Sequence, residues 1–296
     1  MSESIALSAG RKNKKKLWIV FSLPTGYMLA ESAGGLLTHS LALLADAGHM
    51  LTDAGALGLA LFAIRFAERP ATQEKTFGYL RTEILAALGN AVALLLISFY
   101  ILYEAWRRFQ NPPEVTSGPM LIVASVGLIV NFIGMRMLAS AAGESLNAKG
   151  AYLEVLSDTL GSVGVMAASI IMMTTHWYLA DPIIGAGIGL FIVPRTWGLL
   201  KDATHILMEG VPERIDLKTL ETAMRRVGGV SAIHDLHVWT LTSGMDSLTA
   251  HITLQQSGDG GEVLRDLQAL LKTEFKIEHT TLQIEETGTA AETSSI

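Results

Sequence analysis

Hydrophobic residues gather in six long stretches within the first two thirds of the chain. These stretches cover residues 17–37, 41–66, 77–106, 120–141, 151–174 and 178–199. A helix of about 20 apolar residues crosses the roughly 30 Å of hydrocarbon in a bilayer, so each stretch predicts a membrane-spanning helix. The third stretch is longer than a span needs, and we expect its first turns to lie in the membrane interface.

The first stretch follows a basic segment, residues 1–16, and could also be a signal peptide. It ends without a small-residue cleavage site and carries Glu31, which favours a retained helix. With the N-terminus in the cytoplasm, the outer flanks of the six helices hold only Arg107 and Arg108. The positive-inside rule then predicts that both termini are cytoplasmic, in a bacterial inner membrane. The inner flanks hold eleven basic residues: Arg11, Lys12, Lys14, Lys15, Lys16, Arg65, Arg69, Lys75, Arg81, Arg136 and Lys149.

The pattern changes after residue 199. An amphipathic helix is predicted at 217–227, two alternating strands at 232–241 and 247–254, a second helix at 261–275 and a third strand at 280–285. Thr242-Ser243-Gly244-Met245 is a hairpin signal between the first two strands. The order αββαβ predicts a small α+β sandwich, similar to ferredoxin-like metallochaperones. The fold class is thus an α-helical membrane protein, a six-transmembrane-helix bundle with a C-terminal α+β cytoplasmic domain.

We expect four segments in the chain. They are a basic N-terminal segment (1–16), a transmembrane domain (17–206), a cytoplasmic regulatory domain (207–287) and a disordered tail (288–296). Composition agrees with a membrane domain joined to a smaller soluble one, because 50% of the 296 residues are hydrophobic and the mean hydropathy is +0.38. Residues 200–296 hold 8 basic and 15 acidic residues. This excess of acidic residues argues against a nucleic-acid partner. It is compatible with the binding of cations, and a role in keeping the domain soluble would explain it equally well.

Two pairs of ionisable residues interrupt the apolar stretches. His49 and Asp53 lie in the second stretch, and Glu154 and Asp158 lie in the fifth. Each pair has i, i+4 spacing, so both members point the same way from a helix. A charged group at membrane depth costs roughly 3 kcal/mol on insertion scales and usually marks an ion pathway. If the two helices are antiparallel, His49 faces Asp158 and Asp53 faces Glu154.

One imidazole and three carboxylates can form a tetrahedral site for a divalent transition metal. The chain has no cysteine, which excludes disulfides and thiolate ligands. The alternative is that the four residues make ordinary polar contacts between helices. That explanation is expected for Glu31 and Asn131, whereas Asp46, one turn before His49, could also line an outer vestibule.

Six sequence motifs resemble those of the cation diffusion facilitator family, and in particular its bacterial zinc–cobalt–cadmium efflux branch. The motifs are SLALLADAGHMLTD (40–53), RPAT (69–72), FGYLRTEILAAL (77–88), YLEVLSD (152–158), MEGVP (208–212) and HDLHVWT (234–240). The resemblance covers residues 17–286. It implies a homodimeric antiporter that exports Zn²⁺, Cd²⁺ or Co²⁺ from the cytoplasm in exchange for protons, with potassium as a further candidate.

The resemblance also implies that His49, Asp53, Glu154 and Asp158 form the transport site. Many zinc-transporting members carry histidine at the position of Glu154. A site with one imidazole and three carboxylates is harder, so cadmium or cobalt becomes more plausible as substrate. The empty site would carry three negative charges, which predicts proton uptake when metal leaves. The family's histidine-rich loop is missing, because residues 67–76 contain no histidine.

In the cytoplasmic domain the resemblance implies a regulatory metal site at the dimer interface, made by His234, His251 and Glu285. A neighbouring ligand position is Gln283 here, and His279 is a candidate substitute. His234 and His237 are expected on opposite faces of a regular strand. The resemblance further implies that Arg81 and Glu209 form an ion pair that couples the domains; two unrelated surface charges are the alternative.

The residues by themselves leave two other functions to consider. An intramembrane metalloenzyme is disfavoured, because no His-Glu-x-x-His motif is present and no free general base stands beside the four ligands. A metal-sensing membrane receptor without transport would use the same residues.

Overall fold

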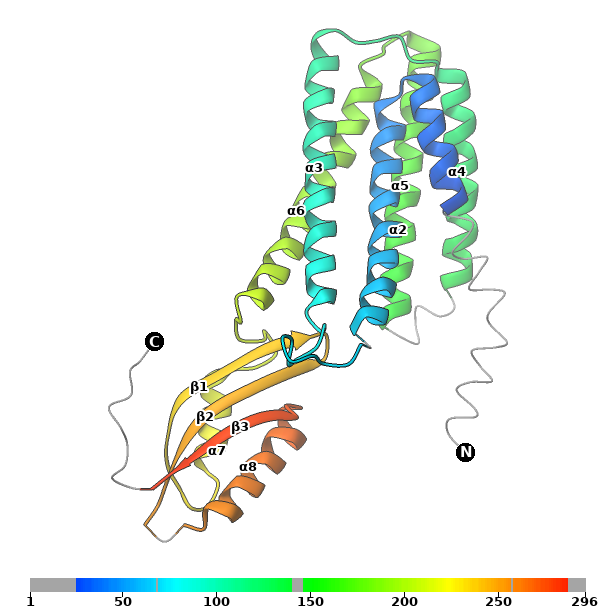
Figure 1. Ribbon diagram of the computed structural model, residues 1–296. Coiled ribbons are helices and arrows are strands. Elements are labelled where there is room, and N and C mark those ends of the chain that lie inside the picture. Colours follow the sequence, from blue (N-terminus) through cyan, green and yellow to red (C-terminus); the bar gives the residue numbers. More distant parts are fainter. Residues whose placement is uncertain (1–24, 68, 140–145, 257, 287–296) are drawn as a thin grey trace. The chain divides into compact units, whose positions relative to one another are not determined.

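The computed structural model describes residues 25–67, 69–139, 146–256 and 258–286 (Figure 1). The chain forms two compact units. The first comprises residues 1–58 and 89–198, and the second comprises residues 59–88 and 199–296. The basic segment 1–16 and the tail 288–296 lie outside the described residues.

Long helices make up the first unit. A helix over residues 25–38 is followed by α2 (Leu41–Ala67), α3 (Thr82–Gln110), α4 (Ser117–Ala139), α5 (Leu146–Thr175) and α6 (Ala180–Leu207). In the described part of the chain, four helices, α3 to α6, are long and apolar enough to cross a membrane. The protein is therefore a multi-pass membrane protein, and the count of six spans stays a prediction.

The helix ends differ from the predicted ones. The helix α3 begins at Thr82, because residues 76–81 form turns rather than the interfacial helical turns expected there. The helix α5 begins earlier than predicted, at Leu146, and α6 continues to Leu207. Apolarity marks the membrane-compatible part of a helix, whereas hydrogen bonding can extend the helix into polar sequence.

Small residues let α2 and α6 pack closely. A Cβ atom added to Gly185 of α6 would lie 3.3 Å from the backbone nitrogen of Ala42, so a side chain here would push the two helices apart. The buried apolar side chains around this contact form two clusters. Their members are Ala42, Leu43, Val115, Met120, Ala124, Val165, Ala168, Met172 and Ala180 in one, and Leu41, Ala45, Ile101 and Ala105 in the other.

A buried carboxylate fixes the start of α2. Asp181, fully buried in the first turn of α6, accepts hydrogen bonds from the Ser40 hydroxyl (2.6 Å) and from the backbone N–H groups of Leu41 (2.7 Å) and Ala42 (3.1 Å). Arg108 of α3 lies 3.4 Å from the same carboxylate. The first N–H groups of a helix lack partners within it, and here a neighbouring helix supplies the acceptor.

The second unit contains the α+β sandwich, in the predicted order. Its elements are α7 (Leu217–Arg225), β1 (Val230–Thr242), β2 (Met245–Leu254), α8 (Gly260–Glu274) and β3 (His279–Glu285). The sheet order is β1-β2-β3, with β1 and β2 antiparallel and β2 and β3 parallel. The aspartates Asp216 and Asp259 cap α7 and α8 through their side chains.

The two short helices cover one face of this sheet. The alternating residues Leu248, Ala250 and Ile252 of β2 are buried in one core cluster with side chains from both α7 and α8. The residues between them, among them His251, therefore lie on the other face. Helix-facing positions are apolar, and the open face carries histidine, threonine and glutamate.

A β-bulge in β1 overturns one prediction. His234 pairs with His251, whereas His237 pairs with Thr249, and the register shifts between them. Asp235 has a positive φ of 53°. His237 follows His234 by three positions, which in a regular strand would place them on opposite faces. The bulge inserts one extra residue between them, so both side chains lie on the same open face of the sheet.

Candidate metal sites

The structure brings together two of the four predicted transport-site residues. His49 Nε2 of α2 and Asp158 Oδ1 of α5 are 3.9 Å apart, and their side chains are only 11% and 13% exposed. Both line a cavity of about 310 Å³ in the first unit, together with Asp46, Ser157 and Gly161. An imidazole nitrogen and a carboxylate oxygen at this separation could share a metal ion.

Asp53 and Glu154 belong to α2 and α5, each four residues from its partner. Their side chains lie outside the described residues.

Asp46 is a further polar residue at this cavity. It is 3% exposed and lines the same cavity as His49. A Cβ atom on Gly161 would lie 3.1 Å from Asp46 Oδ1, so the glycine leaves room for the carboxylate beside α5. The i, i+3 spacing from His49 was the signal in the sequence for this proximity.

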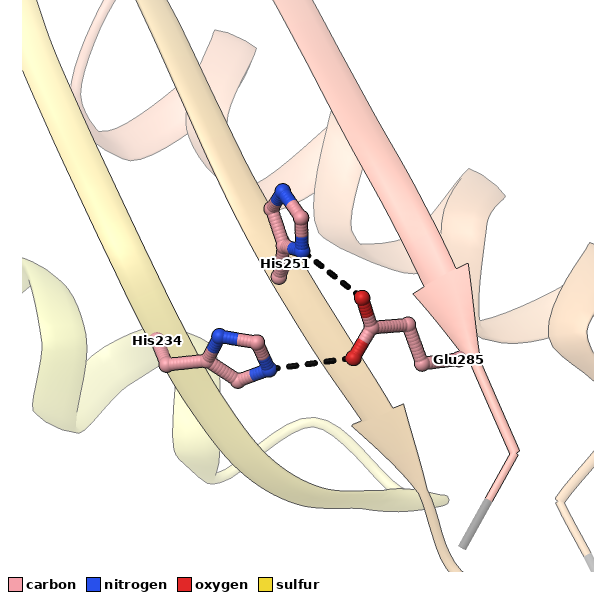
Figure 2. A group of neighbouring side chains, drawn as sticks. All are labelled: His234, His251 and Glu285. Carbon is pink, nitrogen blue, oxygen red and sulfur yellow. Dashed lines mark hydrogen bonds and ion pairs between the residues drawn. The ribbon is translucent and has the colours of Figure 1, made fainter. Parts of the chain in front are cut away.

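A second candidate site lies on the open face of the three-stranded sheet. Figure 2 shows His234, His251 and Glu285 pointing toward one another from three neighbouring strands. His234 Nε2 lies 3.0 Å from Glu285 Oε2, and His251 Nδ1 lies 2.7 Å from Glu285 Oε1. One possible ligand atom from each residue falls within 4.8 Å of the others, which fits two nitrogens and one oxygen around a single ion.

Two polar neighbours support this cluster. The Gln283 amide donates to Glu285 Oε1 at 2.9 Å, so it helps to orient this carboxylate. Asp235 lies 3.0 Å from His237 Nε2 and 3.9 Å from His251 Nε2. Sequence reasoning missed Asp235, because only the bulge brings it near His251.

His279 does not belong to this cluster within one protomer. It pairs with Ser247 at the start of β3, whereas Glu285 at the end of β3 pairs with Thr253. Six residues of strand separate the two by about 20 Å. The His279 ring instead packs against Phe77, with centroids 5.6 Å apart.

The hydrogen bond to His251 is the main reason that the pKa of Glu285 lies below its ordinary value. Desolvation opposes this shift, and the contacts with His234 and Gln283 add to it. The carboxylate is therefore held in the ionised form that a metal ion requires.

Arg81 and Glu209 form the expected ion pair, with 2.8 Å between Arg81 Nη2 and Glu209 Oε1. Their side chains are 35% and 60% exposed, so solvent screens the attraction. Glu83 makes further contacts nearby: it accepts hydrogen bonds from the Thr242 hydroxyl and from the Ser243 hydroxyl (2.6 Å) of the β1–β2 turn. All of these residues belong to the second unit.

Comparison with known proteins assigns the family. A family model described as the cation efflux transmembrane domain matches residues 17–208, and one described as the cation efflux protein cytoplasmic domain matches residues 212–287. The chain belongs to the cation diffusion facilitator family. It is a cation efflux transporter and not an enzyme.

Three curated relatives span almost the whole chain. The metal cation efflux system protein CzcD of Cupriavidus metallidurans is 49% identical, over 92% of this chain and 87% of the relative. The cadmium, cobalt and zinc/H⁺-K⁺ antiporter of Bacillus subtilis is 44% identical, over 92% and 89%. The zinc transporter ZitB of Escherichia coli is 41% identical, over 92% and 88%.

Proposed function

We propose that this protein exports Zn²⁺, Cd²⁺ or Co²⁺ from the cytoplasm in exchange for protons, by alternating access at a site within the membrane bundle. The approach of the largely buried His49 and Asp158 side chains at a cavity of the bundle carries this proposal. The names of the relatives, which include cadmium, cobalt and zinc, support the same substrates. Asp53 and Glu154 would complete a set of one imidazole and three carboxylates.

This ligand set favours exchange of metal for another cation over uniport of the metal alone. Three ionised carboxylates without a cation are too costly in a low-dielectric site, so the empty site should take up protons as metal leaves. The returning carrier would then bring protons inward, and its metal affinity would fall as the site becomes protonated. Potassium could replace protons in part, as the name of the Bacillus subtilis relative indicates for that protein.

The cluster of His234, His251 and Glu285 is proposed as a regulatory metal site in a cytoplasmic domain, with both chain termini on the same side of a bacterial inner membrane. Two imidazoles and a carboxylate leave one tetrahedral position open, which a water molecule or a group of a second copy can fill. The open sheet face that carries them supports a homodimer joined at this face. Metal would then favour one arrangement of the dimer over another.

Flux measurements test the transport proposal. Full-length protein in liposomes with a pH-sensitive dye inside should move Zn²⁺, Cd²⁺ and Co²⁺, each supplied separately, and should move protons in the opposite direction. A metal-sensing receptor is the alternative. It would bind these metals in the same membranes without any flux, and that result would reject the proposal.

A further inference from the structure

Asp46 presents an unpaired carboxylate oxygen within the membrane bundle. The residue is 3% exposed, and no described residue donates a hydrogen bond to Asp46 Oδ2. In the same part of the chain, Asp46 forms no ion pair with lysine or arginine. Burial of an acceptor without a partner is unfavourable, and burial of an unpaired charge is more so. A buried group of this kind in a native fold needs an explanation, and an ion that binds there during function is one.

The cavity beside Asp46 has room for a cation with its water. Its volume is about 310 Å³, whereas a single water molecule needs about 10–15 Å³ of such space. Gly161 lines the cavity next to the carboxylate, and a Cβ atom there would lie 3.1 Å from Asp46 Oδ1. Among the described residues that line the cavity, the ionisable ones are Asp46, His49 and Asp158. Asp46 therefore faces the same space as the proposed ligands.

His49 can share an ion with either of two carboxylates. Its Nε2 atom lies 3.9 Å from Asp158 Oδ1 on α5. Asp46 precedes His49 by three residues on α2, which is about 4.5 Å along the helix axis. Side chains at this spacing have Cβ atoms about 5–6 Å apart, so one small ion can contact both. The two carboxylates thus offer successive positions for an ion, with the imidazole common to both.

We propose that Asp46 is the next ligand of the transported metal ion, which passes from His49 and Asp158 to His49 and Asp46 before it leaves to water. The proposal rests on the proposed function, because it names the next position of the ion carried by that site. In this step the metal–oxygen bond to Asp158 breaks as the bond to Asp46 forms, and His49 stays bound. One carboxylate replaces another, so the charge around the ion is unchanged.

The transfer moves the ion toward the start of α2. In the predicted orientation this end of the bundle faces away from the cytoplasm, which is the direction of export. An ion in transit must bind tightly enough to enter and loosely enough to leave, and neighbouring sites satisfy both needs. One imidazole, one carboxylate and water hold a metal ion less tightly than four protein ligands. Asp46 therefore acts on release of the ion rather than on its selection.

Flux by full-length protein in liposomes tests this role. Asp46→Asn, which is nearly isosteric, should lower the maximal Cd²⁺ flux at least tenfold and should not raise the half-saturating Cd²⁺ concentration. Asp46→Cys should recover part of the flux, because a thiolate also binds this metal. Glu114→Gln, at an exposed position, should behave as the wild type. Wild-type flux in a folded Asp46→Asn protein overturns the proposal. A tenfold higher half-saturating concentration also overturns it, since Asp46 would then belong to the selecting ligand set.

A direct contact between ion and residue 46 is measurable because the chain has no cysteine. In Asp46→Cys, Cd²⁺ buffered near the half-saturating concentration should produce the ultraviolet charge-transfer band of a cadmium–thiolate bond. Glu114→Cys, with an exposed thiol, should give no band under the same conditions. A role of Asp46 in packing alone would not produce this band. Its absence from a folded Asp46→Cys protein overturns the proposal.

Gly161→Ala keeps Asp46 in place and provides a test if the Asp46 variants fail to fold. The added Cβ atom would lie 3.1 Å from Asp46 Oδ1, so the carboxylate must shift and the maximal flux should fall at least threefold. Gly89→Ala, where nothing lies within 4 Å of the added atom, should keep the wild-type rate. An unchanged rate in Gly161→Ala overturns the proposal. Absence of flux in the wild type rejects the proposed function, whereas wild-type flux with any of the failures above rejects only this inference.

Discussion

Asp181 caps a helix to which it does not belong: its Oδ2 accepts a hydrogen bond from the backbone N–H of Leu41, the first residue of α2, at 2.7 Å. The carboxylate is fully buried, and 140 residues separate the two partners in the sequence. His49 lies two turns further along α2, so the contact between α6 and α2 helps to position the proposed metal ligand.

Replacing Asp181 with alanine should destabilise the protein and weaken metal binding. Two helix N–H groups and the Ser40 hydroxyl would lose their acceptor, at a cost of about 2–3 kcal/mol. Thermal unfolding in detergent and metal affinity measured by calorimetry check this expectation. Asp202→Ala, at an exposed position of α6, is the matched control and should change neither quantity. Equal stability of the two variants would show that the cap is dispensable.

Asp158→Ala should abolish metal transport while the protein still folds and dimerises. The substitution removes the carboxylate that lies 3.9 Å from His49 and leaves the apolar packing of α5 largely intact. Zinc and cadmium flux into liposomes should fall at least tenfold, to the level of liposomes without protein. The exposed Glu114→Ala serves as control. Wild-type flux in Asp158→Ala would remove this residue from the transport site.

Glu154→His should shift the preference of the transporter toward zinc over cadmium. The change would give the site two imidazoles and remove one negative charge, so the number of protons exchanged should also fall. The ratio of zinc to cadmium flux in vesicles is the quantity to compare. An unchanged ratio and an unchanged proton count would place Glu154 outside the ligand set.

His251→Ala should weaken metal binding by the cytoplasmic domain but leave part of the transport activity. Calorimetry on full-length protein that also carries Asp158→Ala isolates the cytoplasmic site from the transport site. Loss of one ligand should lower affinity at least tenfold. His279→Ala is a matched control, because His279 lies at the other end of β3. If His279→Ala weakens binding as much as His251→Ala does, a second protomer completes the site.

Glu285→Gln should lower the stability of the metal-free protein at neutral pH, and the effect should vanish in acid. The pKa of Glu285 is lowered in the folded protein, mainly by its hydrogen bond to His251, so the folded state binds this proton less tightly than the unfolded state. The stabilisation is therefore present above the ordinary glutamate pKa of about 4.3 and is lost as pH falls through the lower folded value. Unfolding midpoints across pH, with a chelator present, should converge for wild type and variant. A constant difference at all pH values would contradict this explanation.

Local spacing made several features predictable from the sequence. The apolar stretches predicted the long helices, and alternation with turn signals predicted the order αββαβ. The i, i+4 spacing of His49 and Asp53 predicted a shared helix face, because such neighbours are fixed by the geometry of one helix. The further assumption that the second and fifth helices are antiparallel was enough to predict that His49 faces Asp158.

Contacts between elements were decided by the tertiary structure. The bulge at Asp235 places His234 and His237 on one face, although their spacing predicted two. Strand pairing separates His279 from Glu285, and helix packing alone joins Asp181 to Leu41. Rotation of one helix against another and the register of a strand depend on how the whole core fills space. That information is spread over many side chains, and no local pattern contains it.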